Sequence, residues 1–153
     1  SRGLGDVYKR QTINTPSLLA TEDYIDALEW AQAMGGRKAM FERADANAKI
    51  VLDWIEATPW LRNMVADPAK RTNTGVCFVF QGEWYDQLPD DEKAAVPKKI
   101  VKLLEDRDVG YDFNGYRDAP PSLRIWCGGT VEQEDLKRLL PWIEWAYEQV
   151  KAA

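Results

Sequence analysis

The stretch from Asn114 to Gly129, NGYRDAPPSLRIWCGG, holds the residues best suited to binding chemistry. Arg124 lies in an apolar segment with the alternation of a strand, which predicts that it shares one side with Trp126. The opposite side then carries Leu123, Ile125 and Cys127. An unpaired guanidinium in such a strand would be costly, so Arg124 needs an anionic partner. That partner is either a carboxylate of the protein or the carboxylate of a ligand held by two parallel hydrogen bonds, and the sequence leaves both open.

A second arginine, Arg117, follows Tyr116 in a loop rich in glycine and proline. Loop arginines are more often solvated than functional. Two arginines on either side of the rigid Pro120-Pro121 pair can nevertheless hold two anionic groups of one small molecule. The glycines after the strand would let such a ligand approach the backbone.

The segment TINTPS, from Thr12 to Ser17, offers hydroxyl and amide groups without charge. Asn14, Thr15 and Ser17 suit phosphate oxygens, but they equally suit an ordinary turn and helix cap.

Several classes of chemistry are excluded by the residue types. The chain has no histidine, which rules out a Ser-His-Asp triad, a Cys-His pair and a histidine zinc site within these residues. Cys77 and Cys127 lie in apolar runs without C-x-x-C spacing, and we expect buried, reduced thiols in a cytoplasmic protein. Reactive groups must therefore come from other side chains, from a cofactor, or from sequence outside this chain.

The net charge of -5 makes nucleic acid and anionic membranes poor partners. No apolar run approaches the ~20 residues that span a bilayer, and no signal peptide is visible. With 153 residues and 45% hydrophobic content, the chain is long enough for one domain with a substantial core.

The first eleven residues, SRGLGDVYKRQ, show neither strand alternation nor a helical stripe. They match the translation of an adaptor and transposase-end sequence used to fragment DNA. We expect residues 1–11 to be a disordered, non-native scar rather than a natural disordered arm, followed by an interface arm at 12–20 and one domain at 21–153. On this interpretation the natural protein extends further toward its N-terminus.

Periodicity predicts four helices. The first begins at an N-cap, Thr21, and ends at Gly35-Gly36, and the second carries its apolar stripe from Met40 to Ile55. The third runs from Glu92 to Asp106, weakened near its start by Pro97. The last begins at a capping box of Thr130 and Gln133 and is kinked by Pro141.

Four short strands are expected at 60–67, 73–80, 109–114 and 123–128, with a polar loop at 81–92. Both alternating sets of the second strand are apolar, which indicates burial on both faces. Helices that alternate with short strands predict a layered α/β domain, with helices packed on a small mixed or antiparallel sheet.

From Thr12 to its end, the chain resembles the C-terminal part of the phosphoserine aminotransferases, within the class V family of aminotransferases that depend on pyridoxal phosphate. The segments that carry the resemblance are TINTPS, EDYIDALEWA, RADANAKIVLDWI, RTNTGVC, YRDAPPSLRIWCGGTVE and LLPWIEWAYEQV. The pattern is most similar to the alphaproteobacterial branch. The resemblance implies the small C-terminal domain of a fold-type I transferase.

The resemblance also implies residue roles. Asn14 and Thr15 would reach across a homodimer interface to the phosphate of the partner subunit's pyridoxal 5'-phosphate. Arg124 would hold the α-carboxylate of the substrate, and Arg117 its phosphate. The family often has histidine where this chain has Tyr116, whose hydroxyl can make only a neutral, weaker contact.

The reaction implied interconverts 3-phosphoserine and 2-oxoglutarate with 3-phosphooxypyruvate and glutamate, in serine biosynthesis and, with a second phosphorylated amino acid, in pyridoxine biosynthesis. The lysine that holds the cofactor belongs to the family's large domain, so we assign no catalytic residue here and expect this chain alone to be inactive. Two alternatives stay open: a class V aminotransferase for alanine or serine with glyoxylate, and a non-catalytic module that binds a small molecule. Arg117 distinguishes the first alternative from a phosphoserine aminotransferase, because a substrate without a phosphate would leave Arg117 with no anionic group to bind.

Overall fold

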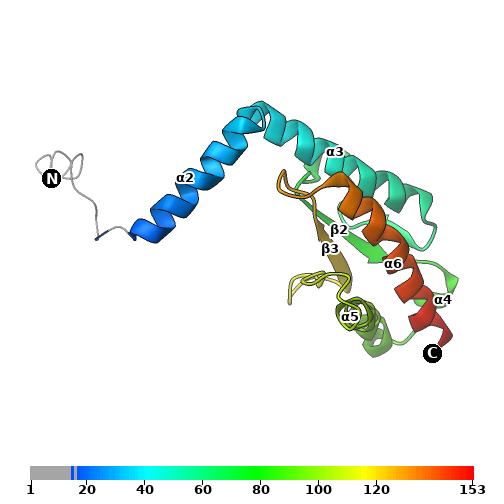
Figure 1. Ribbon diagram of the computed structural model, residues 1–153. Helices are drawn as coiled ribbons and strands as arrows, with labels where there is room; N and C mark the ends of the chain where they lie inside the picture. Colours follow the sequence, from blue (N-terminus) through cyan, green and yellow to red (C-terminus); the bar gives the residue numbers. More distant parts are fainter. Residues whose placement is uncertain (1–14, 16) are drawn as a thin grey trace, which may run out of the picture. The chain divides into compact units, whose positions relative to one another are not determined.

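The computed structural model describes Thr15 and residues 17–153, which fall into two compact units (Figure 1). One unit ends at Ala39, and the other runs from Met40 to Ala153. The predicted scar at 1–11, Asn14 and most of the predicted arm at 12–20 lie outside the described residues.

The first unit contains helix α2 (Leu18–Ala33) and the first residues of α3 (Gly36–Ala57). Its N-cap is Ser17, whose side chain accepts a hydrogen bond from the backbone N–H of Ala20 at 3.3 Å. The prediction that Thr21 caps this helix is wrong. Serine caps as readily as threonine, and with the cap at Ser17 the Thr21 hydroxyl lies inside the helix and donates to the Ser17 carbonyl at 2.9 Å. The predicted end of this helix at Gly35-Gly36 is confirmed, because Gly35 has a φ of 109°, which glycine adopts easily and other residues adopt only with strain.

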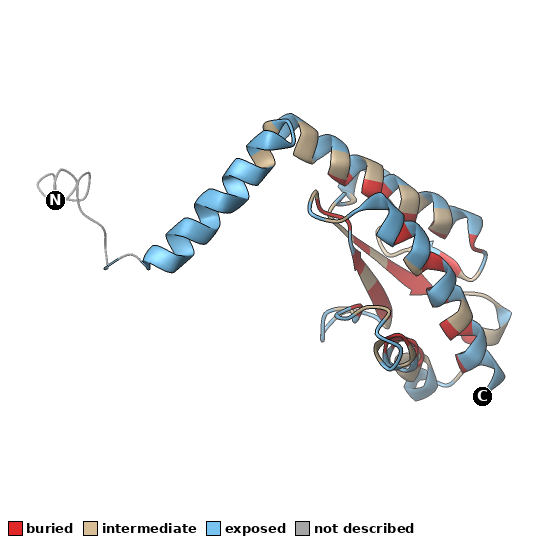
Figure 2. Cartoon of the chain, in the orientation of Figure 1, coloured by how far each residue is buried: buried red, intermediate tan, exposed pale blue. Residues whose placement is uncertain are grey.

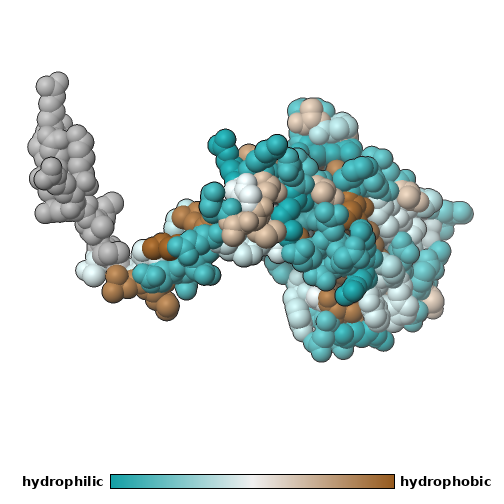
Figure 3. Space-filling model, turned by 45° about the horizontal axis from the view of Figure 1, so that its top comes forward, coloured by the Kyte–Doolittle hydropathy of each residue, from teal (hydrophilic) through white to brown (hydrophobic). Residues whose placement is uncertain are grey.

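Helix α2 buries none of its residues (Figure 2). Its apolar side chains gather along the helix surface (Figure 3). The large exposed ones are Leu18, Leu19, Tyr24, Ile25, Leu28 and Trp30. The predicted apolar stripe is therefore present but covered by nothing in the described part of its unit.

The second unit is built on a three-stranded antiparallel sheet in the order β1-β2-β3, which confirms the predicted fold class. Its strands are β1 (Leu61–Asn63), β2 (Gly75–Phe80) and β3 (Ser122–Trp126). The helices are α3 (Gly36–Ala57), of which residues from Met40 onward belong to this unit, α4 (Glu83–Asp86), α5 (Asp90–Glu105) and α6 (Gln133–Ala152), with a 3-10 turn η1 (Pro68–Lys70).

The core lies between one face of the sheet and the helices α3 and α6. Phe78 of β2 meets Trp54 of α3 edge to face, with ring centres 5.5 Å apart. Phe80 stacks on Tyr147 of α6 at 6.2 Å. Helix α5 packs against α6 and adds its own buried side chains to the same core (Figure 2). Large aromatic rings thus fix how the helices sit on the sheet.

Two predicted strands are shorter than expected. The strand at 60–67 ends at Asn63, because the Asn63 side chain accepts the backbone N–H of Val65 at 2.8 Å and turns the chain. The strand at 109–114 reduces to one isolated bridge between Asn114 and Leu123. Asp112, with a φ of 60°, breaks the extended conformation just before it.

Two helix predictions also need correction. The polar loop at 81–92 contains α4 and the start of α5, whose acidic first turn complements the helix dipole. The Thr130 capping box is absent, because α6 begins after Glu132 and has no side-chain cap. Pro97 lies inside α5 and Pro141 lies inside α6, so both helices continue past their prolines, and the kink expected at Pro141 stays a prediction. In the described part of the chain, no helix has the length and apolar character needed to cross a membrane.

We predict that Leu123→Ala lowers the free energy of unfolding by about 3 kcal/mol, because Leu123 is fully buried and leaves a cavity on the helix-covered face. Leu18→Ala, at an exposed site of α2, should change it by no more than about 0.5 kcal/mol. Urea denaturation followed by circular dichroism measures both. A loss below about 1 kcal/mol for Leu123→Ala would contradict the core described here.

Candidate functional site

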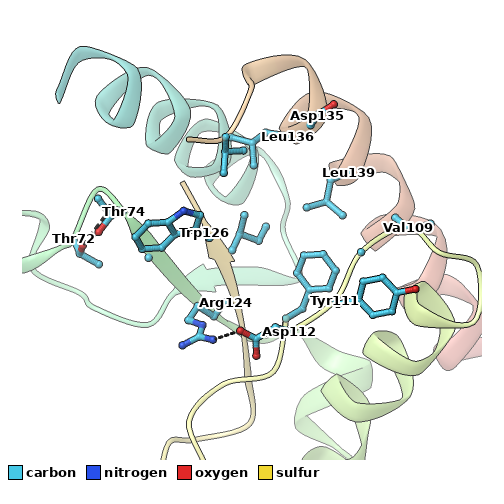
Figure 4. A pocket seen from close by; sticks show the side chains of 15 residues that line it. Thr72, Thr74, Val109, Tyr111, Asp112, Arg124, Trp126, Asp135, Leu136 and Leu139 are labelled. Atoms are coloured by element: carbon cyan, nitrogen blue, oxygen red, sulfur yellow. Dashed lines mark hydrogen bonds and ion pairs between the residues drawn. The ribbon is translucent and has the colours of Figure 1, made fainter. Parts of the chain in front are cut away.

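Strand β3 places Arg124 on the face of the sheet opposite the core. Leu123 and Ile125 are buried, while Arg124 keeps 31% of its side chain exposed and Trp126 is largely exposed. The predicted alternation is therefore confirmed. The Nη2 group of Arg124 donates to Oδ2 of Asp112 at 2.8 Å (Figure 4). Of the two partners left open for this arginine, the structure supplies a protein carboxylate.

The segment after Asp112 is held along the edge of β3. The backbone N–H of Arg124 donates to the Phe113 carbonyl at 2.8 Å, and Gly115 donates to the Ser122 carbonyl at 3.2 Å. The Phe113 side chain is buried in the core. These contacts fix the chain on both sides of Asn114, so Asp112 reaches Arg124 from a defined position.

A hollow of about 590 Å³ opens beside this ion pair (Figure 4). The segment before β2, strand β3, the loop before β3 and the start of α6 line it, through residues that include Thr72, Tyr111, Asp112, Arg124, Trp126 and Asp135. The guanidinium and the indole ring lie on the same strand face. The hollow can therefore take a molecule with an anionic group and an apolar part.

Tyr116 lies beside Arg124, but it lines a different hollow together with Arg117. The Cζ atom of Arg124 is 5.8 Å from the centre of the Tyr116 ring. The Arg117 side chain is 93% exposed and has only a long contact of 3.7 Å with Asp118. It lines a second hollow of about 470 Å³, together with Lys98 of α5. A shared ligand for Arg117 and Arg124 therefore stays a prediction.

A polar clamp on the turn after β3 was missed at the sequence level. Asn47 of α3 donates from Nδ2 to the carbonyls of Gly128 at 3.1 Å and Val131 at 2.9 Å. Arg43 donates to the Gly129 carbonyl at 2.8 Å and pairs with Glu132 at 2.6 Å. The signal in the sequence was a polar residue, Asn47, next to Ala48 of the apolar helix stripe. In the structure Asn47 is only 1% exposed, and a side chain so buried needs hydrogen-bond partners.

The two thiols differ in environment. Cys127 is buried as predicted, and burial raises its pKa to about 11. Cys77 is only half-buried, so the prediction of two buried thiols is wrong for this residue. It pairs in register with Arg124 on the neighbouring strand, and both face away from the core. Both cysteines are free, as expected.

The residues expected to contact a cofactor lie near the start of the described chain. Thr15 is exposed, so its hydroxyl is accessible to a phosphate oxygen. Asn14 lies outside the described residues.

No family profile matches the chain. It is 40% identical over 146 residues to the phosphoserine aminotransferase of Methanosarcina mazei, and 41% identical over 145 residues to that of Methanosarcina barkeri. Each alignment covers 95% of this chain, but only 37% and 36% of the relatives. The chain thus spans little more than a third of the length of these curated relatives.

Two solved structures share the fold. One is phosphoserine aminotransferase from Bacillus circulans subsp. alkalophilus, with a TM-score of 0.71, 20% identity, and coverage of 89% of this chain and 34% of that chain. The other is phosphoserine aminotransferase with bound pyridoxal phosphate from Trichomonas vaginalis, with a TM-score of 0.72, 20% identity, and coverage of 90% and 36%. Part of each of these two structures therefore has the same fold as this chain, with helices packed on a small antiparallel sheet. The chain itself belongs to the phosphoserine aminotransferase family.

We predict that Asn47→Leu lowers the free energy of unfolding by about 2 kcal/mol, because two carbonyls of the turn lose their donor. Lys49→Leu, two residues along the same helix, removes only an exposed ion pair with Asp53 and should cost about 0.5 kcal/mol. Thermal and urea denaturation compare the two. Equal effects would show that the clamp contributes nothing beyond a surface contact.

We also predict that an aromatic disulfide reagent, which reacts with free thiols, labels Cys77 at pH 8 at least about tenfold faster than Cys127. The raised pKa of Cys127 keeps it protonated at this pH, and its burial blocks access. Cys77→Ser and Cys127→Ser variants assign the two rates by spectrophotometry. Fast labelling in Cys77→Ser would refute the prediction.

Proposed function

We propose that this chain is part of a longer phosphoserine aminotransferase and that it binds the carboxylate of the substrate. That protein would interconvert 3-phosphoserine and 2-oxoglutarate with 3-phosphooxypyruvate and glutamate, in the biosynthesis of L-serine. The observation that carries the proposal is the 40% identity to a phosphoserine aminotransferase over nearly the whole chain. Arg124, held at the wall of an open hollow, gives the proposal its chemistry.

Arg124 would bind the α-carboxylate of the amino acid. A guanidinium has five N–H donors, and Asp112 accepts a hydrogen bond from one of its nitrogens. The Asp112 side chain is 84% exposed, and an ion pair so open to water contributes only about 0–1 kcal/mol. A substrate carboxylate can therefore join this arrangement without breaking a strong internal contact.

Arg117 and Tyr116 would meet the phosphate of the substrate. The long contact between Arg117 and Asp118, both more than 90% exposed, leaves the guanidinium available to a phosphate dianion. Tyr116 would add a neutral hydroxyl. The names of the relatives favour the phosphorylated substrate over the alanine or serine and glyoxylate alternative, and over a non-catalytic binding module.

Pyridoxal 5'-phosphate would be the cofactor, as in the structure from Trichomonas vaginalis. When bound, it supplies the electron sink for bonds at the substrate Cα. From this chain, the accessible Thr15 hydroxyl and Asn14 would bind its phosphate across a homodimer interface.

The lysine that holds the cofactor would come from another part of the longer protein. In the described part of the chain, no lysine lines the hollow at Arg124. Lysines of the described residues that instead make surface ion pairs include Lys49, Lys70, Lys102 and Lys137. This chain alone would be inactive, and the longer enzyme would work in the cytoplasm as a homodimer.

We predict that Arg124→Ala and Arg117→Ala, made in the longer protein, each lower kcat/KM for phosphoserine about 30-fold, which corresponds to about 2 kcal/mol for a lost charged contact. The two should differ with glutamate alone. Arg124→Ala should impair the half-reaction with glutamate, which has no phosphate, and Arg117→Ala should spare it.

The matched control is Arg107→Ala. Arg107 lies 4.2 Å from the Trp145 ring centre and lines neither hollow. Steady-state kinetics with both substrates should leave this variant close to wild type. Unchanged kinetics for both Arg124→Ala and Arg117→Ala would overturn the assigned roles.

A further inference from the structure

We propose that Asp112 is a positioning residue for substrate binding: it fixes the Arg124 guanidinium so that its remaining N–H groups meet a ligand carboxylate. The inference rests on the proposed role of Arg124 in carboxylate binding. It adds a residue on a different segment, twelve positions earlier in the chain, to the proposed site.

The side chains of Arg124 and Asp112 are joined by a single hydrogen bond. Within residues 15 and 17–153, the only side-chain hydrogen bond of Arg124 runs from Nη2 to Oδ2 of Asp112. A ligand carboxylate bound bidentately needs two neighbouring N–H groups. One oxygen of Asp112 cannot occupy both edges of the guanidinium, so an edge stays free for the ligand.

The backbone builds the position of Asp112. The next residue, Phe113, is buried and accepts the backbone N–H of Arg124 at 2.8 Å. Asp112 itself has a φ of 60°, a conformation that aspartate tolerates better than most residues. The Tyr116 ring lies 5.8 Å from the guanidinium and supplies a second neighbour. A long, flexible side chain is thus restrained from two segments.

The same carboxylate has an opposing effect, because its negative charge weakens the attraction of Arg124 for an anionic substrate. Exposure decides which effect is larger. With 84% of the Asp112 side chain in contact with solvent, water screens its charge, while the short hydrogen bond keeps its direction. Positioning therefore outweighs repulsion, and removal of Asp112 should weaken carboxylate binding.

The test uses two substitutions in the longer protein. Asp112→Gly removes the acceptor, and glycine adopts a φ of 60° without strain, so folding is not at risk. Asp112→Asn removes the charge but keeps an oxygen acceptor. We expect Asp112→Gly to raise the KM for glutamate about fivefold with kcat changed less than about twofold, and Asp112→Asn to stay within about twofold of wild type.

Asp108→Gly is the matched control. Asp108 also has a positive φ, of 54°, in the same loop, but it accepts a hydrogen bond from the Tyr111 hydroxyl instead of contacting Arg124. This variant removes the same carboxylate chemistry from the same backbone conformation. It should leave the KM for glutamate unchanged.

A binding measurement separates the failure of this inference from the failure of the proposed function. Calorimetry with glutarate, a dicarboxylate that cannot react, should show about fivefold weaker binding for Asp112→Gly whatever amino acid the enzyme converts. A finding that the longer protein does not convert phosphoserine would refute the proposed function, but glutarate binding could still be compared between wild type and Asp112→Gly. Unchanged or tighter glutarate binding in Asp112→Gly, no rescue by Asp112→Asn, or no glutarate binding by wild type would overturn the positioning role.

Discussion

The alternation of strand β3 is the constraint on which the rest of the site depends. Leu123 and Ile125 are buried against the helices, and a slip of one residue would move them into solvent. Arg124 could leave the opposite face only if these two side chains became exposed, so the free energy gained by their burial keeps Arg124 there. The register with β2, which pairs Arg124 with Cys77, fixes the position along the sheet as well.

Two further contacts convert this strand into a site. On one side, Asn47 and Arg43 of α3 bind carbonyls of the turn that follows β3. On the other, the backbone around Phe113 follows the strand edge and brings Asp112 to the guanidinium. The bonds of Asn47 and of the backbone at Phe113 are buried or backbone hydrogen bonds, which are directional and costly to lose, whereas the bond between Arg124 and Asp112 is exposed. The arginine is thus held by rigid elements, although its own side chain is long and flexible.

Under the proposed function, this chain provides binding groups, and other parts of a longer protein complete the reaction centre. It spans little more than a third of the length of its curated relatives. The hollow at Arg124 offers a cation, an indole ring and polar oxygens, and in the described residues no lysine lines it. Helix α2 likewise presents an apolar surface that the described residues of its own unit leave uncovered. These features agree with a domain that shares its function with other parts of a longer protein.

The sequence by itself determined the fold class, the buried stripes of α3 and α6, and the side of β3 that carries Arg124, because hydrophobic periodicity reports directly on burial. Helix starts and the short strands were less predictable. Ser17 and Thr21 are equivalent as caps, and one left-handed residue, Asp112, ends an otherwise plausible strand. Only the tertiary structure decided which carboxylate meets Arg124 and that Arg117 lines a different hollow. Such pairings depend on contacts between segments far apart in the chain, and local residue patterns carry no information about that distance in space.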